Sequence, residues 1–211
     1  FRSNQAPHNL DLWQWIFGMP KRLRATCYNG KYHNIEVEDE ASIYAEYESG
    51  ATATFLTSTG EFPGTNRLEI AGDRGKIVIA DGKLQFWELD ESERSFCFAD
   101  KTGTAVPTFS FNEFTPQQRE TAHVGILQNF TDAILHGAEL IAPGYEGINS
   151  LQISNAAYLS SWTDSWVGLP VDEDMFCSEL DKRIKSSKLK SNASCQPVQS
   201  CEYYSRWNIK W

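Results

Sequence analysis

The sequence predicts an α+β fold, an open, mostly antiparallel β-sheet with helices packed on one face. A short helix opens the chain, apolar and polar residues alternate with a period of two from residue 21 to 99, and helical periodicity returns after residue 115. Turns such as Ser49-Gly50 and Asp81-Gly82 are too short for a parallel crossover, which needs a dozen or more residues. The strands that they join are therefore expected to be antiparallel.

The first expected element is a helix over His8–Phe17. Pro7 suits the first helical position, and Gly18 ends the helix. Apolar side chains recur at helical spacing along one side, which predicts a buried face made of Leu10, Trp13 and Phe17.

Period-two alternation predicts the strands. The expected segments are residues 43–48, 51–57, 68–71, 76–80, 83–89 and 95–99. Helices on one side of the sheet would leave a broad face of Tyr, Phe, Thr and Ala side chains on the other. Such a face is costly to leave in water, so we expect it to contact a partner.

Three later helices complete the expected domain of residues 1–188. One begins at Thr115-Pro116 and ends at Gly137, one runs from Glu146 to Trp166, and one is capped by Asp172. Residues 189–202 are polar and are interpreted as a linker, and the aromatic residues 203–211 are expected to pack as a tail or edge strand.

Composition narrows the functional class. The 211 residues carry a formal net charge of -9, which counts against nucleic acid or an anionic membrane as a partner. No apolar run approaches the roughly 20 residues that span a bilayer. The five cysteines lack CxxC spacing, which favours reduced thiols in the cytoplasm over a disulfide framework or a metal site. Because residue 1 is Phe, the chain is interpreted as a piece of a longer protein.

The densest group of polar residues lies where the first helix begins. His8 and Asp11 are three residues apart and share a helix face. An imidazole with a pKa near 6.5 can take up and return a proton at neutral pH, so His8 is a candidate general acid/base. The spacing alone leaves a structural role open, in which His8 caps the helix and Asp11 interacts with the helix dipole.

Further polar candidates lie at the ends of predicted elements. Glu61, Thr65 and Arg67 leave or enter strands, where they could bind the oxygens of a polyol or form surface pairs. His123 lies on the apolar face of its predicted helix, where it could be a core residue or line a cleft. His33 lies in a loop and is interpreted as a solvated surface residue.

Several stretches together resemble the C-terminal domain of the Gfo/Idh/MocA oxidoreductases, the relatives of glucose-fructose oxidoreductase and inositol dehydrogenase. The resemblance covers residues 3–188 in order and rests on residues 4–20, 38–41, 58–61, 67–76, 123–134, 156–161 and 169–170. It implies a preceding Rossmann domain that binds NAD or NADP. The chain itself has no GxGxxG segment between a strand and a helix, so no cofactor is expected to bind to it alone.

The resemblance also implies roles for individual residues. His8 would be the general acid/base that takes the hydroxyl proton during hydride transfer. The position of Asn4 is commonly acidic in the family; an amide there can orient a substrate hydroxyl but cannot hold its proton. Asp11 would be structural or would fix the tautomer of His8, and His123 would line the substrate cleft.

The resulting hypothesis is a substrate-binding and oligomerisation domain, because the resemblance also implies a subunit interface, in a homodimer or tetramer formed through the exposed sheet face. The full-length protein would transfer hydride between NAD(P) and a sugar, an inositol or a related polyol, and this piece alone would be inactive. Two alternatives use the same scaffold: a non-catalytic ligand sensor or regulator, and a pure assembly module.

Overall fold

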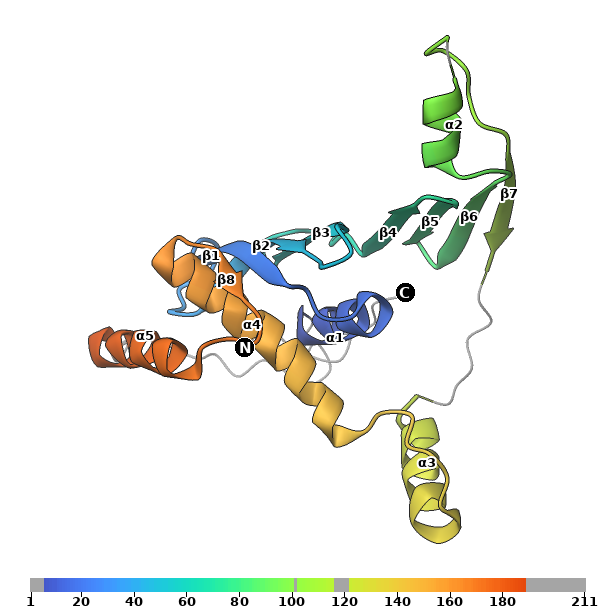
Figure 1. The fold of residues 1–211 in the computed structure, drawn as a ribbon. Helices are drawn as coiled ribbons and strands as arrows, with labels where there is room; N and C mark the ends of the chain where they lie inside the picture. The colour runs from blue at the N-terminus through green and yellow to red at the C-terminus, as the bar shows by residue number, and fades with distance from the viewer. Residues whose placement is uncertain (1–5, 101, 116–121, 189–211) are drawn as a thin grey trace. The chain divides into compact units, whose positions relative to one another are not determined.

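We analysed a computed structural model, which describes residues 6–100, 102–115 and 122–188 (Figure 1). The described residues fall into two compact units. The first unit comprises residues 6–62 and 123–188, and the second comprises 63–100, 102–115 and 122. Each unit is described separately below.

The first unit is built on a four-stranded antiparallel sheet with the strand order β3-β2-β1-β8. Its strands are β1 (Arg22–Asn29), β2 (Glu38–Glu46), β3 (Thr52–Ser58) and the short β8 (Val167–Gly168). In the central register Ala25 lies opposite Ile43, which lies opposite Phe55. These three side chains share one face, which explains the period-two pattern of the sequence.

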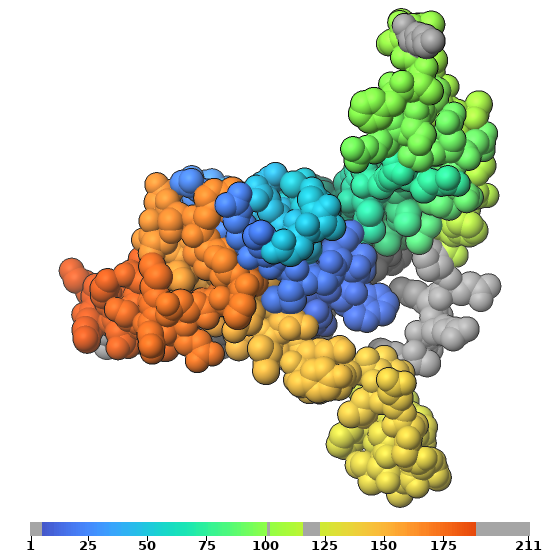
Figure 2. Space-filling view, in the orientation of Figure 1, coloured from blue at the N-terminus to red at the C-terminus, as the bar shows by residue number. Residues whose placement is uncertain are grey.

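Helices α1 (Ala6–Phe17) and α4 (Gly147–Thr163) cover that face. Their apolar sides and the inward-facing strand residues form one core. Helix α5 (Glu173–Ser186) packs on α4 (Figure 2). Phe176 of α5 stacks on Trp162 of α4 with ring centroids 5.5 Å apart. The core consists of Leu10, Trp13, Leu23, Ala25, Ile43, Ala45, Ile153, Ala156, Ala157, Leu159, Val167 and Val171.

Two further helical segments belong to the first unit. Helix α3 spans Ala122–His136, and the single 3₁₀ turn Gly144–Glu146 leads into α4. The start of α5 is fixed by Asp172, whose side chain accepts a hydrogen bond from the backbone N–H of Met175. The predicted Asp172 cap is thereby confirmed.

The second unit contains the antiparallel sheet β4-β5-β6-β7 and one helix. Its strands are β4 (Arg67–Gly72), β5 (Gly75–Ala80), β6 (Lys83–Leu89) and β7 (Phe109–Phe114), and its helix is α2 (Glu93–Ala99). The β4–β5 and β5–β6 connections are tight turns, as the sequence predicts.

The structure confirms the α+β class and the antiparallel strands. It divides the strands between two four-stranded sheets, and it adds β1, β7 and β8, which the sequence analysis did not place as strands. The predicted strand over 95–99 is wrong, because this segment belongs to α2. Ser92 caps that helix by accepting from the N–H of Ser95, and Asp73 accepts from the N–H of Arg94.

Some predictions fall on residues outside the described ranges. The predicted helix start at Thr115-Pro116 can be followed only from Ala122 onward, and the linker 189–202 and the aromatic segment 203–211 lie wholly outside them. Across the described ranges, no helix combines the length and apolar character needed to cross a lipid bilayer.

Candidate functional site

Helix α1 presents His8 and Asp11 to solvent from its first turns. On its opposite side Leu10 and Trp13 are buried. Trp13 stacks almost parallel on Phe55 of β3, with ring centroids 5.8 Å apart and an interplanar angle of 7°. Because this stacking fixes which side of α1 faces the sheet, it also fixes the outward side that carries the predicted acid/base residue.

The buried side-chain amide of Gln14 connects α1 to α4 by a hydrogen bond. Gln14 is 7% exposed; its Nε2 donates to Asp11 Oδ1 at 3.1 Å, and its Oε1 accepts from Asn149 Nδ2 at 3.1 Å. The carboxylate of Asp11 thus helps to satisfy a buried side chain. A contact of Asp11 with His8 stays a prediction, and Asn4 lies outside the described residues.

The other predicted site residues are divided between the two units. Glu61 follows β3, and the exposed His123 lies in the first turn of α3, both in the first unit. Thr65 and Arg67 belong to the second unit, where Arg67 Nη2 lies 2.6 Å from Glu69 Oε2 on the same face of β4. Glu69 also contacts Lys76 of β5, so Arg67 is part of a surface ion-pair cluster. Of the predicted site residues that the structure describes, His8 and Asp11 lie on one exposed face of α1.

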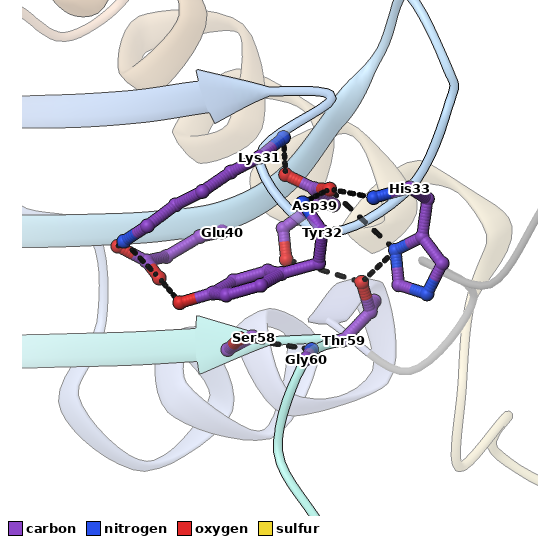
Figure 3. A network of polar contacts seen from close by, with 8 residues as sticks. All are labelled: Lys31, Tyr32, His33, Asp39, Glu40, Ser58, Thr59 and Gly60. Atoms are coloured by element: carbon purple, nitrogen blue, oxygen red, sulfur yellow. Dashed lines mark hydrogen bonds and ion pairs between the residues drawn. The ribbon is translucent and has the colours of Figure 1, made fainter.

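A denser polar network, not predicted from the sequence, joins the β1–β2 loop to the end of β3 (Figure 3). At its centre is Asp39, which is 2% exposed. Its Oδ1 accepts the backbone N–H of Lys31 at 3.0 Å. Its Oδ2 accepts those of Tyr32 and His33 at 2.7 and 3.0 Å. Three consecutive amides therefore converge on one carboxylate, and the loop has a fixed conformation.

The environment of Asp39 keeps this carboxylate ionised. Burial acts to raise the pKa of Asp39, but the backbone N–H groups of Tyr32, His33 and Lys31 outweigh burial and hold the pKa below its usual range. The imidazole of His33 acts in the same direction, with Nδ1 3.5 Å from Asp39 Oδ2.

Thr59 connects the same loop to β3. Its backbone N–H and its hydroxyl both donate to the carbonyl oxygen of Asp39, at 2.9 and 3.2 Å. The hydroxyl oxygen also lies 3.2 Å from His33 Nδ1. His33 is thus held between a buried carboxylate and a hydroxyl, and the expectation of a merely solvated residue is incomplete.

Tyr32 and Glu40 extend the network to the open side of the sheet. The hydroxyl of Tyr32 donates to Glu40 Oε2 at 2.6 Å, and Lys31 Nζ lies 2.8 Å from both carboxylate oxygens. The ring of Tyr32 lies directly on Gly60, where an added Cβ would come within 2.5 Å of the ring carbons. Only glycine leaves room for the ring at this position.

The sequence contained a signal for this network. Asp39 has the same strand parity as Ala41 and Ile43, so it lies on the buried face of β2. A carboxylate in phase with core residues predicts a buried charge that needs several donors. The donors themselves could not be predicted, because they are backbone groups whose direction depends on the loop conformation.

A metal centre is not formed by these acidic and histidine residues. Searched over the described ranges, the chain shows no group of three or more His, Cys, Asp or Glu side chains arranged to hold a metal ion.

The fold is that of an oxidoreductase C-terminal domain. The family model for the oxidoreductase family, C-terminal α/β domain, matches residues 1–169. The chain therefore belongs to the Gfo/Idh/MocA oxidoreductases, as their C-terminal domain. A search of curated proteins finds no match.

Solved structures share the fold. A WlbA dehydrogenase from Bordetella pertussis, in complex with NADH and UDP-GlcNAcA, is 21% identical with a TM-score of 0.58, over 80% of this chain and 44% of that chain. The WlbA dehydrogenase from Chromobacterium violaceum, with the same two ligands, is 25% identical with a TM-score of 0.60, over 81% and 46%. An oxidoreductase domain protein from Kribbella flavida is 17% identical with a TM-score of 0.63, over 79% and 49%. The chain thus spans less than half the length of each of these three relatives.

Proposed function

We propose that this chain is the substrate-binding domain of an NAD(P)-dependent oxidoreductase. The full-length protein would transfer hydride between the nicotinamide and a carbinol carbon of a sugar, an inositol or a related polyol. The observation that carries the proposal is the family match over residues 1–169, which includes α1 with its exposed His8. The WlbA complexes with NADH and a nucleotide sugar support the same class of cofactor and substrate.

The described residues do not fit a dinucleotide themselves. The glycine-rich segment Gly72-Asp73-Arg74-Gly75 is the hairpin turn between β4 and β5, and no helix follows it to receive a pyrophosphate. We therefore assign cofactor binding, of NAD or of NADP, to a part of the protein outside these residues. The hydride chemistry belongs to that cofactor.

The proposed roles of this chain are to accept the substrate's hydroxyl proton and to position the substrate. Oxidation of a carbinol releases a hydroxyl proton, and His8 is proposed to accept it as a general base. Asp11 would hold the start of α1 in place through Gln14, and Asn4 would orient a hydroxyl. The remaining proposed substrate contacts are Glu61, Thr65, Arg67 and His123.

Self-association is the second part of the proposal. On the open face of the first sheet, Tyr44 is 41%, Leu56 70% and Trp166 37% exposed. Tyr44 and Trp166 meet edge to face at 5.9 Å, which forms an aromatic surface suited to a second copy of the chain. We propose a dimer or tetramer through this face, in the cytoplasm.

A hydride-transfer assay tests the function. The full-length protein would be screened with NAD and NADP against inositols, aldoses and UDP-GlcNAcA, with His8→Ala beside it. Loss of a positioned general base lowers kcat by about 10²–10⁴-fold. His136→Ala, an exposed histidine in the last turn of α3, is the matched control and should leave turnover unchanged.

The alternatives give different results in the same assay. Ligand affinity without turnover across the panel would favour the sensor, and neither affinity nor turnover would favour the assembly module. Turnover that survives His8→Ala would keep the oxidoreductase and remove His8 as its proton carrier.

A further inference from the structure

Trp15 is the largest apolar side chain on the outer side of α1. It is 71% exposed, whereas the two residues before it, Trp13 and Gln14, are buried. Trp13 stacks on Phe55 of β3, and Gln14 accepts a hydrogen bond from Asn149 of α4. Because each helical residue is turned by about 100° from the one before, these two contacts direct the indole of Trp15 away from the sheet and from α4.

The same side of α1 carries the exposed His8. Seven residues make almost two full helical turns, so His8 and Trp15 are aligned, about 10 Å apart along the helix axis. Asp11 lies between them, one turn from each. Ile16, next to Trp15, is also exposed. The outer side of α1 is therefore polar in its first turns and apolar in its last turns.

The proposed reaction limits what can lie over this side of α1. When a carbinol is oxidised to a carbonyl, the hydride leaves the carbon and the proton leaves the oxygen bonded to that carbon. The general base must come within about 3 Å of the oxygen, and the hydride acceptor within about 3–3.5 Å of the carbon. If His8 is the base, the part of the protein that holds the hydride acceptor must approach α1 from its outer side.

We propose that Trp15 is a contact between this domain and the cofactor-binding part of the full-length protein. Interfaces between domains of one chain bury about 600–1,500 Å², so they extend about 10–15 Å from their centre on each partner. Trp15 lies within that distance of His8, and tryptophan is enriched among the residues that dominate interface energies. The inference rests on the proposed function, because it takes His8 as the position of the reaction.

The position of Trp15 carries this inference, and its exposure alone would not. Single exposed apolar side chains are normal on protein surfaces. Ile184 of α5, for example, is also exposed, on a helix without a candidate catalytic residue. Trp15 differs because it is aligned with His8 on a helix that is fixed against both β3 and α4. In this arrangement Trp15 is a positioning residue, which acts on the reaction by holding the two parts of the protein together.

The contact can be tested without turnover. Hydroxyl-radical oxidation of the full-length protein, followed by tandem mass spectrometry, measures how accessible each side chain is. The buried Trp13 is the reference for a protected indole, and Met175 of α5, 45% exposed, is the reference for an accessible side chain. We expect Trp15 to be oxidised about as slowly as Trp13. Oxidation of Trp15 at a rate close to that of Met175 would overturn the inference.

Kinetics and oligomeric state identify what covers Trp15. In the full-length enzyme Trp15→Ala should lower kcat about 10–100-fold, because a misplacement of about 1 Å between reacting groups has an effect of this size. The KM of the substrate should change by less than about threefold, and Trp15→Phe should restore most of the rate. Ile184→Ala is the matched control for the loss of an exposed apolar side chain and should leave kcat unchanged.

Two results would assign Trp15 to another partner and overturn the inference. A tenfold rise in KM at constant kcat would show that the indole contacts the substrate. A smaller oligomer of Trp15→Ala in sedimentation, with unchanged kcat, would show that it contacts a second copy of the chain.

This inference and the proposed function fail separately. If His8→Ala abolishes turnover and Trp15 is oxidised freely, the proposed function stands and this inference is wrong. If no member of the panel is turned over, the proposed function loses its support. The oxidation rate of Trp15 and the oligomeric state of Trp15→Ala then decide whether Trp15 lies in a contact within the full-length protein.

Discussion

The hydroxyl of Ser160 in α4 accepts a hydrogen bond from the backbone N–H of Ala25 in β1 at 2.9 Å, and it donates to the carbonyl of Ser165 at 2.6 Å. Strand β8 pairs with β1 only at Arg22 and Leu23, so the rest of this edge of β1 has no neighbouring strand. Ser161, the next residue of α4, repeats the arrangement two residues further along β1 by accepting from the N–H of Cys27 at 2.9 Å. Helix α4 thus replaces a strand at the sheet edge.

Ser160→Ala should therefore destabilise the first unit. Ser160 is fully buried, and its loss leaves the N–H of Ala25 without an acceptor and the carbonyl of Ser165 without its donor. The expected loss is about 1–3 kcal/mol, measured by urea unfolding of the chain. Ser154→Ala is the control, because among the described residues the Ser154 hydroxyl bonds to the carbonyl of Leu151 within α4, and its loss should change stability little. Equal effects of the two variants would contradict the edge-covering role.

Gly60→Ala should disturb the β1–β2 loop through Tyr32. The added Cβ would come within 2.5 Å of the tyrosine ring, so the ring must move and its hydrogen bond to Glu40 must break. Overpacking of this kind costs about 1–3 kcal/mol. Gly64→Ala is the matched control, because a Cβ at Gly64 meets no atom within 4 Å, and thermal unfolding of both variants makes the comparison.

A double variant identifies the cause of that loss. In Tyr32→Ala the ring is absent, so adding Gly60→Ala to it should cost much less than Gly60→Ala costs in the wild type. Additive losses would show that the glycine is required for a backbone reason and not for the close approach of the ring.

Strands β2 and β3 and the helices of the first unit could be predicted because local pattern and tertiary packing agree there. The alternation around Ile43 and Phe55 and the helical spacing of Leu10 and Trp13 describe the faces that form the core. Strand β8 could not be predicted, because its two residues gain their strand geometry only by pairing with β1. The segment 95–99 alternates like a strand, but Asp73 accepts from the N–H of Arg94 and Ser92 from that of Ser95, which starts a helix at Glu93.

The candidate site was partly predictable for a related reason. The exposed position of His8 could be predicted because it lies in the first turn of a helix, where the local sequence decides which side chains are exposed. His33, Asp39 and Thr59 come from three segments of the chain, and their contacts depend on sheet register and on a loop conformation. Period-two spacing predicts that Asp39 is buried but not which amides reach it.

Acid should remove the stabilising effect of Asp39. Because the loop amides lower its folded-state pKa, the folded protein binds fewer protons at Asp39 than the unfolded chain does. This contribution to stability is fully present above the unfolded pKa of about 4 and is lost as the pH falls through the lower folded pKa. The stability difference between the wild type and Asp39→Asn should therefore be largest near neutral pH and shrink below pH 4.

Urea unfolding of both proteins across that pH range measures this difference. Glu179→Gln is the comparison, because in the part of the chain that the structure describes Glu179 pairs with its helix neighbours Lys182 and Arg183, and pairs of this kind contribute little to stability. A difference between the wild type and Asp39→Asn that stays constant with pH would show that Asp39 acts through its shape and not through its charge.

Cys27 should resist alkylation until the first unit unfolds. Burial, and to a lesser extent the charge of Glu38, raise the pKa of its thiol to about 11, so very little reactive thiolate is present at pH 8. Cys177 is exposed on α5 and is the internal control. Iodoacetamide treatment followed by peptide mass mapping should find Cys177 modified early in native buffer and Cys27 modified only in urea. Modification of Cys27 and Cys177 at the same rate in native buffer would show that β1 opens at Cys27 without global unfolding. That result would contradict the conclusion that Ser160 and Ser161 cover the edge of β1.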